Sequence, residues 1–343
     1  MPHGSSASPG WFVKVINEVI KGLEQGAAYL HEVIVFDSDP TAHVKTMRTL
    51  FERLREHNLN FSPSKARLGA TDADFLGRSF SLAGVRPNAD KISALIKMPM
   101  PRDRNQVRAL LGGVWYYRKF LRDLSKRTRP ITSFLRNGVK FEFTPAMEVV
   151  REVIVELAAP PILVFPDWDA VADGSRPFHV YCDACIDGLG AALEQEQPDC
   201  FVWPIAYISR STLDSERHWT PLDVEANSIV WAIKRLRGYL RRTKFRIFSD
   251  KVLESMGKVG DHNARVQRWL VFLTAFNYTF EYRKGSAKGS ADFLSRLPEL
   301  ATERDRTGSS SLTPVEHGGI FLIRACALRS RASPIPGVGL RGC

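Results

Sequence analysis

Four acidic residues in the C-terminal half of the chain have the type and spacing to build a catalytic site. Asp183 ends a strand-like run over 178–183, and Asp250 ends a second run over 245–250. If these strands are parallel neighbours, both carboxylates emerge at one edge of the sheet, where open α/β sheets place their sites. The simpler alternative for each residue is a polar turn that ends a strand.

Glu225 and Asp292 are expected on helices. Glu225 continues an inward apolar stripe on the helix expected over 221–241, and a carboxylate that faces a core is costly unless a cation compensates it. Asp292 opens a short helix after Gly289. For both residues the alternative is an acid in a first helical turn, which the helix dipole favours. The stripe consists of Ile229, Ala232, Ile233, Leu236 and Leu240.

Brought to one point, these four carboxylates would repel one another unless divalent cations lay between them. Hard oxygen ligands suit Mg²⁺ or Mn²⁺. Two such ions can activate water and stabilise the attacking and leaving oxygens of a phosphodiester. The set Asp183, Glu225, Asp250 and Asp292 therefore predicts a nuclease that depends on two Mg²⁺ or Mn²⁺ ions.

The charge of the chain is concentrated in one segment. The 343 residues contain 48 Lys and Arg against 37 Asp and Glu, a net charge of +11. Residues 88–140 hold 13 basic and three acidic residues, interleaved with aromatics, and 234–246 hold seven basic residues without an acid. Basic residues beside aromatics suit a surface that follows a phosphate backbone. The expected nucleic-acid contacts are Lys91, Lys97, Arg104, Arg108, Tyr116, Tyr117, Arg118 and Lys119.

Two other interpretations of segment 88–140 are a solvated helix face and a basic membrane-surface helix. Pro99, Pro101 and Gly112–Gly113 interrupt the segment and oppose the membrane helix. No apolar run reaches the ~18 residues of a membrane span, and no secretory signal opens the chain. Five cysteines are too few for a disulfide framework. We therefore expect a protein that is intracellular, in the cytoplasm or the nucleus, and not secreted or membrane-bound.

The length of 343 residues predicts two or three domains, and the hydrophobic periodicity predicts an α/β protein. In the N-terminal part we expect helices over 11–24, 41–54, 89–98, 103–112 and 114–123, and strands over 28–36, 66–69 and 74–82. Another helix is expected over 145–157. The C-terminal part reads β-β-β-α-β-α-β-α, with strands over 178–182, 189–193, 201–209, 244–249 and 278–283 and helices over 221–241, 263–275 and 290–297.

The acids are separated by 42, 25 and 42 residues, and the sequence around them is specific. Together these features resemble the ribonuclease H domain of Ty3/gypsy-type long-terminal-repeat retrotransposon reverse transcriptases. The resemblance runs from about residue 2 to 298, and its upstream part is similar to the palm end and thumb of the same enzymes. The matching stretches include Tyr181-Cys-Asp-Ala, Gly188-Leu-Gly-Ala-Ala-Leu, Val224-Glu-Ala-Asn-Ser, Ser249-Asp-Lys, Ala291-Asp-Phe-Leu and Leu110-Leu-Gly-Gly-Val-Trp-Tyr-Tyr.

The resemblance implies a truncated palm and a helical thumb, followed by a ribonuclease H-like domain with a mixed five-stranded sheet flanked by helices. It also implies that all four nuclease carboxylates are present and that the partner is an RNA–DNA hybrid, whose RNA strand is hydrolysed. The expected boundaries are a palm remnant over 1–87, a basic thumb over 88–140, a connection over 141–176, a ribonuclease H-like domain over 177–298 and a disordered tail over 299–343.

The polymerase part departs from the family. The family's hairpin motif has an aromatic residue, a variable residue and two aspartates, whereas this chain has Tyr29, Leu30, His31 and Glu32. His31 is neutral or cationic near neutral pH and does not replace a metal-binding carboxylate. The fingers and an earlier palm strand are also expected to be missing. The resemblance therefore implies that RNA-directed DNA polymerase activity is lost.

Two rivals to an active nuclease remain open. The chain could be a non-catalytic nucleic-acid-binding remnant of a decayed element, or another chain could supply the missing polymerase half, which His31 opposes. A smaller feature, the Cys-x-x-Cys pair of Cys182 and Cys185, has no second pair for zinc. We interpret these cysteines as ordinary small residues at a strand end.

Overall fold

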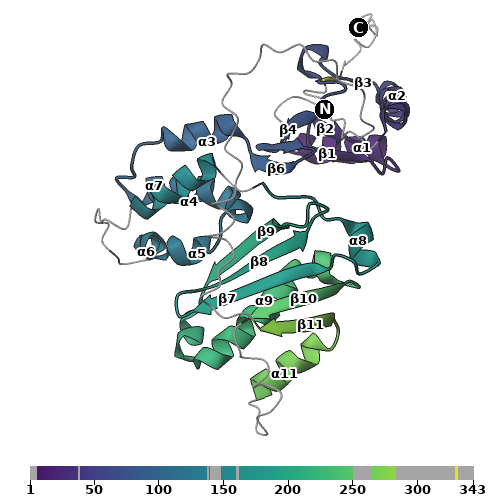
Figure 1. The fold of residues 1–343 in the computed structure, drawn as a ribbon. Helices are drawn as coiled ribbons and strands as arrows, with labels where there is room; N and C mark the ends of the chain where they lie inside the picture. Colours follow the sequence, from purple (N-terminus) through teal and green to yellow (C-terminus); the bar gives the residue numbers. More distant parts are fainter. Residues whose placement is uncertain are drawn as a thin grey trace, which may run out of the picture. The chain divides into compact units, whose positions relative to one another are not determined.

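The computed structural model describes residues 6–37, 39–136, 139, 148–159, 162–249, 264–282 and 329–330. It divides the chain into two compact units, one made of residues 1–83 with 312–343 and the other of 84–311. Figure 1 labels the elements of both units. Within the described residues no helix has the length and apolar character to cross a bilayer.

The first unit packs two helices against short β-hairpins. Its core contains Ile16 and Val19 from α1, Val33 and Val35 from β2, and Leu50 from α2. Asp39 caps α2 by accepting a hydrogen bond from the Ala42 N–H at 2.6 Å. The elements are α1 (Ser8–Ile20), β1 (Gly26–Tyr29), β2 (Glu32–Val35), α2 (Pro40–Glu56), β3 (Leu59–Asn60), the 3₁₀ turn η1 (Pro63–Lys65), β4 (Asp72–Phe75), β5 (Arg78–Ser81) and β12 (Arg329–Ser330).

Two predicted strands of this unit are hairpins instead. The run 28–36 is divided by a turn at Leu30 and His31, and the run 74–82 by a turn at Leu76 and Gly77. Leu30, Leu76 and Gly77 have positive φ values of 52°, 50° and 67°, as tight two-residue hairpin turns require. Residues 66–69, expected as a strand, lie outside any strand.

The second unit begins with helices whose apolar sides form one core with part of a sheet. The boundaries of its first half are β6 (Gly84–Pro87), α3 (Ala89–Ile96), α4 (Arg104–Tyr116), the 3₁₀ turn η2 (Arg118–Phe120), α5 (Leu124–Arg127), α6 (Arg129–Thr132), η3 (Ser133–Leu135), α7 (Glu148–Ala158) and α8 (Trp168–Ala172). The expected break at Gly112–Gly113 is absent, because α4 continues through both glycines. A Cβ on Gly113 would lie 2.7 Å from the Leu95 side chain, so this glycine lets α3 pack closely on α4.

The second half of this unit is a mixed five-stranded sheet with helices, as predicted. Its elements are β7 (Phe178–Cys185), β8 (Gly188–Glu196), β9 (Val202–Ser211), η5 (Asp214–His218), α9 (Pro221–Leu240), β10 (Lys244–Ser249), α11 (Ala264–Leu273) and β11 (Asn277–Tyr282). The strand order is β11-β10-β7-β8-β9, in which the first three are parallel and the β7–β8 and β8–β9 pairs antiparallel. Helix α9 packs on β7 and β8 and contacts α11 (Figure 1).

The sheet has two differently covered faces. One row across it, made of Tyr181, Ala192 and Tyr207, joins the core of helices α3 to α7. The adjacent positions Val180, Ala191 and Leu193 pack instead with α9. Because successive residues of a strand point to opposite faces, the basic segment covers one side of the sheet and α9 covers the other.

Candidate functional site

Asp183 lies inside a strand and not at its end, which corrects the sequence prediction. Strand β7 continues to Cys185, and Asp183 is paired with Gly190 of β8. Strand alternation places Asp183 on the face of Tyr181, which is opposite the face that Cys182 shares with α9. The side chain is partly exposed on the side of the sheet that the basic segment covers.

The parallel pairing of β7 and β10 is confirmed. Phe248 lies opposite Tyr181, and the two rings stack with their centroids 4.5 Å apart. In the sequence Asp183 and Asp250 each follow this pair by two positions. Asp250 and Asp292 themselves lie outside the described residues.

Glu225 is placed by the N-terminal part of α9. Thr220 caps this helix by accepting a hydrogen bond from the Asp223 N–H at 3.2 Å, and Pro221 occupies the first turn. The predicted apolar stripe is buried, with Ile229 and Ile233 fully inaccessible. Glu225 continues this stripe and is half-buried, which agrees with the predicted inward position.

The pKa of the Cys182 thiol is affected by both described carboxylates, Asp183 and Glu225. Burial raises its pKa most, and the negative charges of Glu225 and Asp183 raise that pKa further. Two acids that both act on one thiol lie within electrostatic reach of the same point on β7. The Ser249 hydroxyl, at the end of β10 and next to Asp250 in the sequence, is buried and has no hydrogen-bond partner among the residues that the structure describes.

The described part of the chain contains no group of three or more His, Cys, Asp or Glu side chains arranged to hold a metal. Cys182 and Cys185 form no disulfide. Among the described acids, only Asp183 and Glu225 belong to the predicted metal-binding set. Their carboxylates are hard oxygen ligands of the kind that Mg²⁺ and Mn²⁺ prefer.

The predicted nucleic-acid contacts are mostly at the surface. Lys91 on α3, Lys97 just after α3, Arg108 on α4, and Arg118 and Lys119 on η2 are exposed, whereas Arg104 is partly exposed. Tyr116 is 48% exposed. The assignment of Tyr117 is wrong, because its side chain is 4% exposed and its ring packs in the core beside Phe120.

Sequence reasoning missed that part of the basic segment pairs with acids of the same unit. Arg127 binds Glu156 at 2.5 Å, and Arg129 binds Asp187 at 3.2 Å. Both arginine side chains are more than two-thirds buried. Charge counting did not reveal these pairs, because the partner acids are distant in the sequence.

The motif Tyr29-Leu30-His31-Glu32 spans the β1–β2 hairpin. Tyr29 pairs with Glu32, and Leu30 and His31 form the two-residue turn between them. Tyr29 is 56% exposed. The departure from the family pattern therefore occupies the tip of this hairpin and the first residue of β2.

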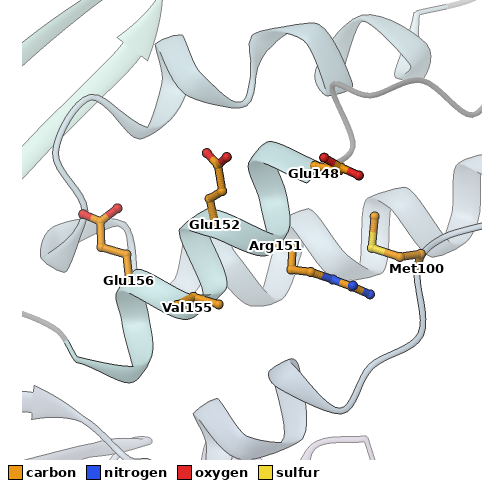
Figure 2. Close-up of a pocket in the computed structure, with 6 residues that line it drawn as sticks. All are labelled: Met100, Glu148, Arg151, Glu152, Val155 and Glu156. Carbon is orange, nitrogen blue, oxygen red and sulfur yellow. The ribbon is translucent and has the colours of Figure 1, made fainter.

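A pocket of about 570 Å³ lies along α7 (Figure 2). Its three glutamates rise from successive turns of α7, whereas Arg151 extends on the side of Met100 (Figure 2). Three carboxylates around one arginine give the pocket a negative balance, which opposes a phosphate ligand. The lining residues are Met100, Glu148, Arg151, Glu152, Val155 and Glu156.

Comparisons with known proteins agree with this architecture. The RNase H-like domain found in reverse transcriptase matches residues 173–276, and the reverse transcriptase (RNA-dependent DNA polymerase) family matches residues 1–80. A retrovirus-related Pol polyprotein from transposon 297 of Drosophila melanogaster is 31% identical over 305 residues, which are 87% of this chain and 28% of the polyprotein. This chain carries the reverse transcriptase and ribonuclease H-like domains of gypsy/Ty3-type retrotransposons.

Another relative of this retrotransposon chain is also a transposon polyprotein. The transposon Tf2-3 polyprotein of Schizosaccharomyces pombe is 28% identical over 306 residues, which are 87% of this chain and 22% of that polyprotein. The chain thus spans less than a third of these relatives. The predicted family and its keywords, reverse transcriptase, ribonuclease H and retrotransposon, are confirmed.

Solved structures confirm the fold class. A foamy viral protease-reverse transcriptase in complex with double-stranded DNA matches 87% of this chain and 51% of its own length, with a TM-score of 0.69 and 20% identity. The foamy viral enzyme in complex with an RNA/DNA hybrid matches 92% of this chain and 42% of its own, with a TM-score of 0.66 and 19% identity. At these identities the likeness establishes the fold.

Proposed function

We propose that the second unit hydrolyses the RNA strand of an RNA–DNA hybrid. The observation that carries this proposal is the parallel β7–β10 pair, with Asp183 and Asp250 each two positions beyond the last paired residues and Glu225 on the helix that covers β7. The described pairing of these strands ends at Tyr181 and Phe248. Asp183 is on the face of β7 opposite α9, and Glu225 is on α9, so we expect their carboxylates to approach one another at the edge of β7 beyond this pairing.

The carboxylates Asp183, Glu225, Asp250 and Asp292 would hold two Mg²⁺ or Mn²⁺ ions. When bound, such ions supply charge stabilisation for the attacking and leaving oxygens of a phosphodiester. The chain's own contribution is to hold these acids on a rigid sheet and helix and to bind the duplex. The foamy viral relatives whose structures contain duplexes support a duplex partner for this chain.

The nuclease is tested by cleavage of an end-labelled hybrid with Mg²⁺. We expect the wild-type chain to cut the RNA strand and Asp183→Asn to abolish cutting, because the substitution removes a charged oxygen ligand. Asp169→Asn is the matched control, since Asp169 is an exposed acid on α8 and is not one of the four proposed carboxylates. Equal inactivity of wild type and Asp183→Asn would refute the proposal.

We also propose that this chain does not transfer nucleotides. The supporting observation is that His31 occupies the hairpin turn where the family pattern has its first aspartate. The same observation favours a second candidate function, a non-catalytic nucleic-acid-binding remnant. Salt-sensitive binding of a hybrid without cleavage would support that remnant, whereas rescue of DNA synthesis by an added fingers–palm fragment would support assembly with another chain.

A further inference from the structure

A carboxylate from the basic segment lies directly against the strand next to Asp183. Gly190 of β8 is paired with Asp183, and a Cβ built on this glycine would be only 1.9 Å from Oδ1 of Asp123. The same Cβ position is 3.9 Å from the carbonyl oxygen of Asp183. The missing side chain at residue 190 therefore makes room for Asp123 beside the backbone of Asp183.

Asp123 occupies a backbone conformation that few residues adopt. It has a φ of 49°, in the left-handed region, between the end of η2 and the start of α5. Asn, Asp and Gly reach this region at the lowest cost. The left-handed turn brings the Asp123 side chain onto the sheet and directs α5 along it.

The residues after Asp123 continue the same attachment. The Ser125 N–H donates to the Ser209 hydroxyl at 3.0 Å, and Ser209 is paired with Gly190. Asp123 and Ser125 thus cover Gly190 and Ser209, which form one row of the sheet with Asp183. Each contact is made to a strand that is itself fixed by the sheet.

Arg129, four residues beyond Ser125, attaches the basic segment to the sheet at a second place. Its guanidinium donates to the Asp187 carbonyl at 2.6 Å and to the Thr212 hydroxyl at 3.0 Å, and its side chain is 16% exposed. Asp187 lies in the turn after β7, and Thr212 follows β9. The basic segment is therefore attached to the sheet at two places, at this row and at the β7–β8 turn, beside a core that includes Tyr181 and Tyr207.

We propose that Asp123 is a positioning residue that fixes the basic segment to the sheet row that carries Asp183. A duplex held by the basic segment is thereby presented to the nuclease at a set distance, so the contact determines where the RNA is cut. This inference rests on the proposed function. A shift of about 1 Å in such a support can cost about a hundredfold in rate, so a fixed attachment has a catalytic consequence.

The test compares three substitutions. Asp123→Gly keeps the left-handed turn and removes the carboxylate, whereas Asp123→Asn keeps both the turn and the side-chain volume. Gly190→Ala places a Cβ where the carboxylate lies, and Gly238→Ala is its control, because a Cβ there meets no atom within 4 Å. Hydrogen exchange over 188–211 and 123–131 and the positions of cuts on an end-labelled hybrid are measured for each protein.

We expect Asp123→Gly and Gly190→Ala to raise exchange in both segments about tenfold, as loss of a packed polar contact would. Both should scatter the cuts that the wild type makes at one distance from the hybrid end, and Asp123→Asn and Gly238→Ala should keep the wild-type pattern. If Gly190→Ala does not fold, Asp123→Gly decides the question.

Unchanged exchange and unchanged cut positions in Asp123→Gly would overturn the proposal. Raised exchange with unchanged cut positions would also overturn it, because Asp123 would then be merely structural. A wild type that cuts no hybrid refutes the proposed nuclease, and the exchange measurement then decides the attachment of Asp123 by itself.

Discussion

The ion pair of Arg210 and Glu216 is expected to stabilise the region that carries Glu225. The two terminal guanidinium nitrogens of Arg210, Nη1 and Nη2, each donate to the Glu216 carboxylate at 2.6 Å. The Glu216 carboxylate also accepts the Leu213 N–H at 2.8 Å and the Asn227 side-chain amide at 2.9 Å. Asn227 is two residues beyond Glu225 on α9, so Glu216 joins β9, η5 and the part of that helix that carries Glu225.

Glu216→Gln removes the charge while it keeps the shape. The Glu216 side chain is 6% exposed and that of Arg210 is 26% exposed, so the substitution leaves a largely buried arginine without its counter-charge. A fully buried pair broken in this way costs about 3–5 kcal/mol, and the residual exposure of Arg210 reduces our expectation to about 2–3 kcal/mol. For a unit of this size, that corresponds to a fall in Tm of about 4–12 °C.

The stability that the Glu216 carboxylate contributes depends on pH in a defined direction. Burial raises the pKa of Glu216, but the hydrogen bonds from Arg210 and from the Leu213 N–H outweigh burial, so the pKa lies below its ordinary value of 4.5. A carboxyl whose pKa is lower in the folded state stabilises the fold above its unfolded pKa and loses that effect as pH falls through the folded pKa. The difference between wild type and Glu216→Gln is therefore largest at neutral pH and disappears in acid.

Thermal unfolding followed by circular dichroism, at neutral pH and in acid, measures both effects. The control is Glu281→Gln, which breaks the Arg246–Glu281 pair of the same unit, 3.2 Å apart with both side chains 44% exposed. Exposed pairs contribute at most about 1 kcal/mol. A Glu216→Gln protein that is no less stable than this control, or a difference that grows in acid, would refute the reasoning.

Two further predictions concern nucleic acid. Replacing Lys91, Lys97 and Arg108 together by Ala should reduce the magnitude of the slope of log K against log salt for hybrid binding by up to about 3, because each phosphate contact contributes roughly 0.9. The control Arg151→Ala, which changes an arginine among the glutamates of the α7 pocket, should leave the slope unchanged. A slope that is the same in the triple variant would exclude α3 and α4 as the duplex surface. In primer extension on an RNA template with Mg²⁺ and nucleotides, we expect no product, because His31 offers no carboxylate; an extended primer would contradict this expectation.

Strong periodicity made the sheet and α9 predictable from the sequence. Strands of alternating or β-branched residues and a helix with a continuous apolar stripe retain their structure in most surroundings. The stripe also placed Glu225 correctly, because its position follows from helical geometry alone. Tight turns such as Leu76–Gly77 were missed, since a positive φ at leucine has no clear sequence signal.

Tertiary contacts decided what the sequence left open. Leu95 packs closely on Gly113 within α4, and Tyr117 at the end of α4 lies in the core, neither of which follows from local sequence. Asp183 falls within β7 because β8 pairs with the strand as far as Cys185. In each case the deciding neighbour is far away along the chain or in another element, where local patterns carry no information.

The basic segment also shows why its net charge overstates its phosphate-binding surface. Towards its C-terminal end, Arg127 and Arg129 neutralise Glu156 and Asp187 and attach the segment to its own unit. Towards its start, Lys91, Lys97 and Arg108 are exposed. Largely buried arginines that are already paired with an acid release few counterions when a phosphate approaches, so binding should depend on the exposed lysines and arginine. A duplex is therefore expected on α3 and α4, while α5 and α6 hold this surface on the sheet that carries Asp183.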